Sequence, residues 1–432
     1  MRRSLTTLGT AALVAAAAWH TVIRPARLAA AEAERNAAAA RQELAIRSQD
    51  IAFYERRAAE DPQSAEDRAM VAGLYLQRAR ETGEVDDYRA AERFARAALD
   101  LRRVRNGKAL LAYASALLAQ HKFPEALTAA RELIASEPSE PRYRALYAEL
   151  LIEMGQYDAA GAQFDSLRND LRTLAVAPRY ARYLEFIGRT EHARSVLRRA
   201  VRDMADADLP REQIAWFHLR AADLELRSGR LRVAERALDL GLSAAPRDGR
   251  LWAARARLHA LRREWRDVLA AVSRAGDRTD IATIALMGDA YAALGDSIKA
   301  REAWSEARDM GTENPEPFNR QWTLFKLEHG IDLANTRALL EQEITIRQDV
   351  YGWDQLALAR YMTNDIAGAA VAMREAMSVG TRDANLLYHA ALIARAEGDP
   401  SRARSFAQQA LELNPHFHHR FVPEARVLAS GR

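Results

Sequence analysis

Apolar and polar positions alternate with a helical period along nearly the whole chain. In LLYHAALIARAEGDPSRARSFAQQALELNP, residues 386–415, two runs with apolar residues three and four apart flank a Gly-Asp-Pro break, the pattern of two helices joined by a short turn. Residues 24–61 hold no glycine and no proline after Pro25, which predicts one long, alanine-rich helix with a stalk-like front half. Glycine (20) and proline (13) are scarce overall, so the pattern predicts an all-α protein.

A small residue recurs at a nearly constant interval and reveals internal repeats. It occurs at Ala91, Ala126, Ala160, Ala193, Ala234, Val268, Ala300, Ala369 and Ala403. The first three intervals are 35, 34 and 33 residues, the fourth is 41 and marks an insertion, and the interval of 69 spans two periods. One degenerate repeat is therefore expected between Glu316 and Gln348. The pattern predicts about ten helical hairpins over residues 65–415, followed by a C-terminal capping segment over residues 416–432.

The segment MGDAYAALGDSIKAREAWSEA, residues 287–307, resembles the tetratricopeptide repeat, a pair of antiparallel helices of about 34 residues. Small Gly288 and Ala300 let the two helices cross closely, and Gly295 ends the first helix. Aromatic Tyr291 and Trp304 fill the wedge between neighbouring hairpins. The resemblance implies a right-handed superhelical solenoid of about ten such hairpins, with a concave groove lined by the first helix of each hairpin.

The resemblance also implies where a partner would bind. Groove contacts in this family come from exposed positions at fixed offsets in the first helix. On this chain the offsets fall on Lys108, Arg142, Glu149, Arg182, Glu185, Trp216, Asp223, Arg250, Arg257, Asp289, Tyr351, Asp354, Asn385, Tyr388 and Arg395. Arginine, carboxylate and aromatic side chains together suit an extended peptide or a partner helix. Tyr351 and Asp354 are the pair we would mutate first. The chaperone-tail set of the family is not matched, because Leu111 and Ser115 occupy two of its positions.

Motifs that would indicate catalysis are missing from the sequence. There is no GxG, GxSxG or HExxH motif and no cysteine, so a non-catalytic protein without a cofactor or metal is expected. His416, His418 and His419 lie close together, but none are four residues apart as two ligands on one helical face would be. The segment is interpreted as a lid on the repeat array. An enzyme with a site inside the solenoid is the weaker alternative, since ten hairpins leave no room for a catalytic domain.

The charge pattern argues against nucleic acid as a partner. The 63 basic and 59 acidic residues leave a net charge of +4 without a basic cluster. A helical-repeat RNA binder should have a strongly basic groove, whereas Glu149, Glu185, Asp223 and Asp289 alternate with arginines. A protein or peptide partner is therefore expected, and the sequence leaves the oligomeric state open.

The N-terminus has the layout of an export signal. MRR precedes SLTTLGTAALVAAAAWHTVI, an uncharged and mostly apolar run that ends at Ile23. Residues 1–23 are predicted to be a signal peptide cleaved near Ala16–Ala18 or an inner-membrane anchor through residues 5–23. The expected protein is an exported, periplasmic or anchored scaffold of bacterial envelope assembly or secretion. The alternative is a cytoplasm-facing, membrane-anchored regulatory adaptor.

Overall fold

The computed structural model describes residues 24–204, 206–276, 280–313 and 319–431. The predicted signal or anchor at residues 1–23 lies outside this part of the chain. Within it, no helix combines the length and the apolar character that crossing a membrane requires. All regular elements of the described residues are helices, as predicted.

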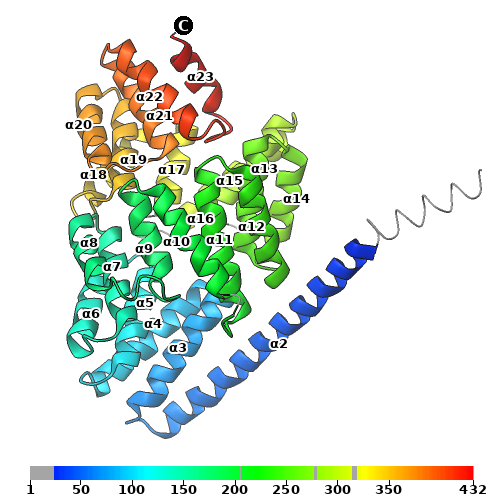
Figure 1. The fold of residues 1–432 in the computed structure, drawn as a ribbon, viewed down its shortest axis with the longest axis vertical. Helices are drawn as coiled ribbons and strands as arrows, with labels where there is room; N and C mark the ends of the chain where they lie inside the picture. The colour runs from blue at the N-terminus through cyan, green and yellow to red at the C-terminus, as the bar shows by residue number, and fades with distance from the viewer. Residues whose placement is uncertain (1–23, 205, 277–279, 314–318, 432) are drawn as a thin grey trace, which may run out of the picture.

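Within the described residues, ten helical hairpins follow the long helix α2 (Arg24–Glu60), which confirms the predicted solenoid (Figure 1). The first five are α3 (Ala65–Thr82) with α4 (Val85–Leu101), α5 (Gly107–Ala119) with α6 (Phe123–Ser136), α7 (Pro141–Glu153) with α8 (Tyr157–Ser166), α9 (Ala177–Phe186) with α10 (Thr190–Met204), and α11 (Arg211–Arg227) with α12 (Leu231–Ala244). The last five are α13 (Gly249–Arg262) with α14 (Trp265–Ala275), α15 (Ile281–Ala293) with α16 (Ser297–Glu313), α17 (Arg320–His329) with α18 (Leu333–Glu343), α19 (Val350–Met362) with α20 (Ile366–Met377), and α21 (Ala384–Ala396) with α22 (Pro400–Leu413). The chain ends in α23 (Val422–Ser430).

The predicted repeat chemistry is visible in the hairpin of α15 and α16. A Cβ atom added to Gly288 would overlap the ring of Trp304, so only glycine permits this close crossing. The Trp304 indole Nε1 donates a hydrogen bond to the carbonyl of Ala285 at 3.3 Å. Gly295 has a φ of +88°, the left-handed conformation that ends α15. The degenerate repeat also forms a hairpin, α17 with α18, inside the region that the interval of 69 residues indicated.

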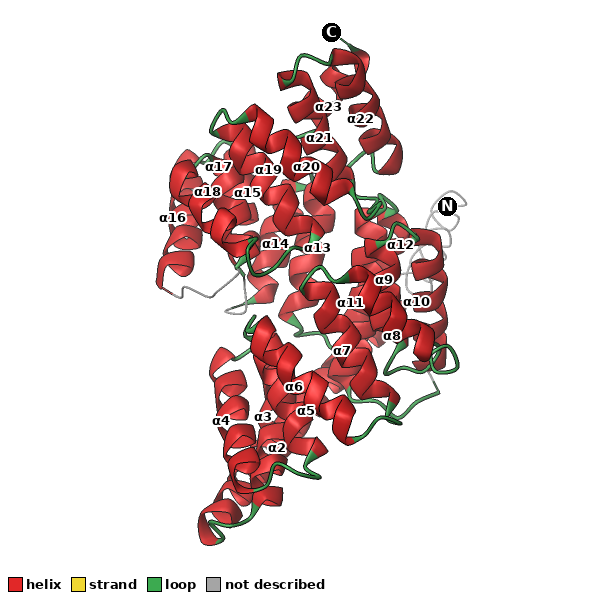
Figure 2. Cartoon of the chain, turned by 90° about the vertical axis from the view of Figure 1, so that its left-hand side faces the viewer, coloured by secondary structure: helices red, strands yellow, loops and turns green. Residues whose placement is uncertain are grey.

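The first helices form the inner layer of the stack. α3 packs against α5, α7 against α9, α11 against α13, and every first helix from α13 to α21 packs against the next one. The second helices, α4 to α22, make no comparable contacts with one another within the described residues. First helices therefore lie on the inside of the curvature and second helices on the outside. Figure 2 shows the stack from the side, with α3 to α6 at one end and α21 to α23 at the other.

Successive turns of the superhelix touch each other. The Arg347 guanidinium donates to the Glu153 carbonyl at 2.8 Å, and the Val350 amide donates to the Tyr157 hydroxyl at 3.0 Å. The Thr381 hydroxyl donates to the carbonyl of Phe186. These bonds join segments 193 to 195 residues apart. The loops before α19 and α21 are thereby held against the C-terminal ends of α7 and α9.

Helix α2 is attached to two parts of the stack. Its rear half packs on α3, where Ile51 is buried and Glu55 accepts a hydrogen bond of 2.7 Å from the Tyr75 hydroxyl. Further forward, Asn36 accepts a bond of 2.7 Å from Arg211 of α11, and its amide donates to the carbonyl of Ser243 in α12 at 2.5 Å. The front half is thus held against the fifth hairpin, which sequence periodicity alone did not indicate.

The last helix, α23, covers the apolar end of the stack. Val422, Ala425 and Leu428 are buried with Tyr388 of α21, and Phe417 from the preceding loop completes this cluster. The same loop reaches back to the fifth hairpin, because the side-chain amide of Asn414 donates to the carbonyls of residues 226 and 227, both at 3.1 Å.

Candidate functional site

A series of ion pairs connects the first helices of four consecutive hairpins, α7, α9, α11 and α13. Each pair joins a carboxylate on one first helix to an arginine on the next. The pairs are Glu149–Arg179, Glu153–Arg182, Glu185–Arg220, Glu185–Arg227, Glu212–Arg250 and Asp223–Arg257. We call these residues the inner ladder, because they lie on the inner layer of helices.

Helical spacing places the members of the inner ladder on one face of each helix. Glu149 and Glu153 are four residues apart on α7 and bind Arg179 and Arg182, which are three apart on α9. The Arg179 Nε atom lies 2.7 Å from a Glu149 oxygen. Glu185 lies one further turn along α9 and therefore faces the next helix, α11.

Two arginines of α11, Arg220 and Arg227, bind Glu185 and differ in their exposure to solvent. Arg220 is mostly buried, and burial lowers its pKa more than the nearby Glu185 raises it. Arg227 is partly exposed. Burial lowers the pKa of Arg227 as well, but the nearby Glu185, and to a smaller extent Tyr351 and Asp223, raise this pKa above its usual value. Both guanidiniums remain protonated at any physiological pH, so the inner ladder keeps its charges.

Six of the residues predicted from the repeat offsets belong to the inner ladder. They are Glu149, Arg182, Glu185, Asp223, Arg250 and Arg257. Lys108 makes a similar contact earlier in the stack, 2.6 Å from Glu66 of α3. Their charges are thus paired with residues of neighbouring repeats. A partner would therefore have to bind the hydrogen-bond donors and acceptors that these ion pairs leave unused.

Other predicted residues lie apart from the inner ladder. Asp289 binds His419 of the C-terminal loop at 2.8 Å, and Arg395 binds Glu424 of α23 at 3.2 Å. Trp216 is half-buried, with its ring edge-on to Phe217. Two more predicted residues lie outside the inner ladder. The Arg142 guanidinium lies over the neighbouring tyrosine ring, 5.0 Å from its centroid, and Asn385 is partly buried in the first turn of α21.

Three predicted residues in the last hairpins do not have the exposure expected of them. Asp354 is 6% exposed, and its carboxylate lies 2.9 Å from Nδ1 of His389. Tyr388 is 2% exposed, and its hydroxyl donates to Glu424 at 2.8 Å. Tyr351 is partly buried, with its hydroxyl 3.4 Å from an Asp383 oxygen. The expectation of exposed groove positions is wrong for Asp354 and Tyr388, because α21 packs over the first and the cap over the second.

The repeat offsets missed five members of the inner ladder: Glu153, Arg179, Glu212, Arg220 and Arg227. A different signal could have found several of them. Acidic residues on one first helix recur opposite arginines about one repeat later, at separations of 30 residues for Glu149–Arg179 and 29 for Glu153–Arg182. Pairing between adjacent repeats would have been the better criterion.

The C-terminal histidines bind carboxylates individually. His418 Nε2 lies 3.4 Å from Glu328 and His419 Nε2 lies 2.8 Å from Asp289, whereas His416 is exposed. These contacts fix the C-terminal loop to α15 and α17. Among the described residues, the group whose ligand atoms are close enough for a metal ion is instead His259, Glu264 and Asp267.

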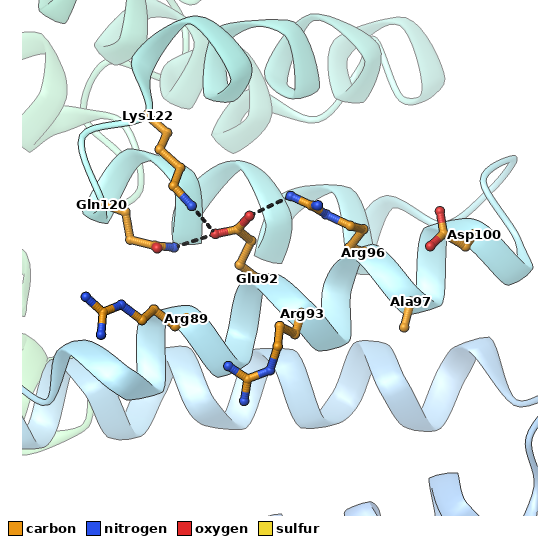
Figure 3. Close-up of a pocket in the computed structure, with 8 residues that line it drawn as sticks. All are labelled: Arg89, Glu92, Arg93, Arg96, Ala97, Asp100, Gln120 and Lys122. Atoms are coloured by element: carbon orange, nitrogen blue, oxygen red, sulfur yellow. Dashed lines mark hydrogen bonds and ion pairs between the residues drawn. The ribbon is translucent and has the colours of Figure 1, made fainter. Parts of the chain in front are cut away.

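A second basic region lies on the outer helix α4 (Figure 3). It is an open hollow of about 370 Å³ lined by Arg89, Glu92, Arg93, Arg96, Ala97, Asp100, Gln120 and Lys122. In Figure 3, Glu92 accepts bonds from Lys122 and Arg96, both at 2.6 Å, and from Gln120 at 2.9 Å. Arg93 points away from these pairs and has no ion-pair partner within the described chain.

Comparisons with known proteins identify the repeats. Tetratricopeptide repeat models match residues 117–182 and 384–417. A solved structure similar to this chain is the APC/C hetero-tetramer Cut9-Hcn1, with 14% identity, 90% of this chain and 95% of that chain covered, and a TM-score of 0.34. Another is a tetratricopeptide repeat protein from Parabacteroides merdae, with 15% identity, coverage of 56% and 92%, and a TM-score of 0.35. No curated protein sequence matches. Residues 117–182 and 384–417 of this chain are thus identified as tetratricopeptide repeats.

Proposed function

We propose that this protein is a non-catalytic scaffold that binds a segment of a partner protein along the inner ladder. The observation that carries the proposal is the continuity of the inner ladder over four first helices, α7 to α13. Tetratricopeptide repeats are protein-interaction modules, and repeat stacks use extended surfaces on the inside of their curvature. A linear segment that crosses several hairpins would contact one ion pair of the inner ladder, here called a step, on each hairpin.

A photo-reactive amino acid introduced in cells tests this proposal. The inner position is Arg257, whose side chain is exposed on α13, and the control position is Arg93, exposed on the outer helix α4. We expect the inner position to form adducts with a protein segment that mass spectrometry can identify. Adducts that are equally frequent at both positions, or absent at the inner one, would refute binding along the inner ladder.

The cellular setting is part of the same proposal. The signal-like sequence at residues 1–23 supports export or anchoring, and envelope assembly or secretion is then the setting we propose. Protease treatment of intact spheroplasts tests it. Digestion without lysis is the expected result, whereas protection until lysis would favour the cytoplasm-facing regulatory adaptor instead.

A further inference from the structure

The two sides of the inner ladder differ in their exposure to solvent. Arg257 is 53% exposed and its partner Asp223 only 18%. Arg227 is 43% exposed and Glu185 only 12%. The carboxylates therefore lie beneath the guanidiniums, and a molecule approaching the inner layer meets the arginines first.

The other steps of the inner ladder show the same order. Arg182 is 34% exposed above Glu153 at 10%, and Arg250 and Arg179 are also more exposed than their carboxylates. Arg220 is the exception, since it and Glu185 are both mostly buried. A surface that is nearly neutral by its count of charges is thus cationic where it meets solvent.

Arg227 and Arg257 also retain most of their hydrogen-bonding capacity. A guanidinium has five N–H donors. Arg257 donates one bond, from Nη2 to Asp223 at 2.7 Å, and Arg227 donates one, from Nη2 to Glu185. Arg250 differs, because its Nε, Nη1 and Nη2 atoms all donate to Asp248 or Glu212. Arg182 of α9 also donates a single bond, to Glu153, but it is less exposed. The most exposed free donors of the inner ladder therefore lie on adjacent helices, α11 and α13.

We propose that the partner segment is acidic, and that its Asp or Glu carboxylates bind the free N–H groups of Arg227 and Arg257. This inference rests on the proposed function, because it specifies the partner of the same surface. Guanidinium and carboxylate form charge-assisted, often bidentate hydrogen bonds, the strongest class available to such a surface.

The spacing of the helices sets the spacing of the acidic residues. Packed helices lie about 8–10 Å apart, and a segment in the extended polyproline II conformation advances about 3.1 Å per residue with three residues per turn. Carboxylates at every third position of such a segment lie on one face and would therefore meet arginines on successive first helices. A compact cluster of acidic residues would reach only one step of the inner ladder.

A nucleic acid is a poorer match than an acidic protein segment. Five carboxylates lie beneath the six arginines of the inner ladder: Glu149, Glu153, Glu185, Glu212 and Asp223. A phosphate backbone carries a charge at every nucleotide and gains affinity from dense, uncompensated cations. Separated acidic side chains match the separated, compensated arginines better.

Peptide binding to the purified full-length chain tests the inference by fluorescence anisotropy. The probe is a labelled, extended peptide with Glu at every third position, and the reference peptide has Gln at those positions. A single-stranded RNA of similar length is the third probe. We expect only the Glu peptide to bind, with an affinity that falls as salt rises. Equal binding of both peptides, or tighter binding of the RNA, would overturn the proposal.

Two variants with opposite expected effects locate the binding. Arg227→Gln with Arg257→Gln should weaken binding of the Glu peptide by about tenfold or more, since the charge-assisted hydrogen bonds to both guanidiniums are lost. Asp223→Asn should strengthen it, because Arg257 is then released from its intramolecular partner. The control, Arg89→Gln with Arg93→Gln, removes the same charge from α4 and should change nothing.

An equal loss in the control variant, or weaker binding by Asp223→Asn, would contradict the assignment to the inner ladder. Circular dichroism of each variant verifies that the repeats remain folded. The two proposals fail in different ways. If the photo-reactive residue at position 257 captures segments without acidic residues, the acidic partner is wrong and the scaffold stands. If it captures no protein, the proposed function itself is wrong.

Discussion

The middle and the last hairpins use corresponding repeat positions in opposite ways. On α7 to α13, charged residues of the first helices bind the neighbouring repeat and, except at Arg220, keep part of the arginine at the surface. On α19 and α21, Asp354 and Tyr388 come from the same set of offsets but are buried. The difference lies in what packs above each position. An offset within a repeat therefore predicts the helix face, while the neighbouring elements decide whether that face binds a partner.

The largest effect in this comparison is expected from Tyr388→Ala. Its ring contacts Phe417 and Phe421, and its hydroxyl binds Glu424, so the variant leaves a cavity under the cap. We expect the free energy of unfolding of this end to fall by about 3–5 kcal/mol. Urea denaturation, with hydrogen exchange over residues 422–430, measures it.

The control for this substitution is Asn385→Ala, one turn earlier on α21. This side chain is partly exposed and should change the stability by no more than about 0.5 kcal/mol. Equal effects of the two variants would mean that Tyr388 is not a structural residue, and its prediction as a binding residue would deserve a new test.

An intermediate effect is expected from Asp354→Asn, which keeps the shape of the side chain but removes its charge. Burial lowers the pKa of His389, but Asp354 outweighs burial and the net pKa is raised. The variant should lose about 1–3 kcal/mol near neutral or acidic pH, because the buried hydrogen bond to His389 is no longer charge-assisted. Asp354 is consequently a poor choice for a variant intended to affect binding alone.

The loss of stability caused by Asp354→Asn should depend on pH. Since the folded pKa of His389 is raised, its contribution to stability is fully present below its unfolded pKa of about 6.5 and is lost as pH rises through the folded pKa. The difference in unfolding free energy between parent and Asp354→Asn should therefore shrink as pH increases. A difference that grows with pH would contradict the pairing.

The smallest effect on stability is expected from Arg257→Gln. The pair with Asp223 is largely exposed on the arginine side, and such surface pairs contribute about 0–1 kcal/mol. Thermal unfolding should match that of Arg93→Gln, an exposed residue of α4. A loss of several kcal/mol would show that this step of the inner ladder holds the stack together and is not mainly a binding surface.

Local periodicity was sufficient to predict the helices, the hairpins and the degenerate repeat. Gly288 and Trp304 lie within one repeat, so their contact follows from spacing that the sequence displays. The burial of Asp354 could not be predicted in this way, because its partner His389 belongs to the next repeat and is 35 residues away. The contact of Asn36 with Arg211 spans 175 residues and depends on the curvature of the whole stack. Information on such distant contacts is not present in a repeat pattern.

Arginine-specific footprinting shows whether a partner segment covers the exposed arginines of α11 and α13. A dicarbonyl reagent should modify Arg227 and Arg257 of the free protein faster than buried Arg194 and Arg347. Adding the Glu-containing peptide should then protect Arg227 and Arg257 and leave Arg93 reactive. Continued reactivity of Arg257 with saturating peptide, or protection of Arg93 instead, would contradict binding on the inner ladder.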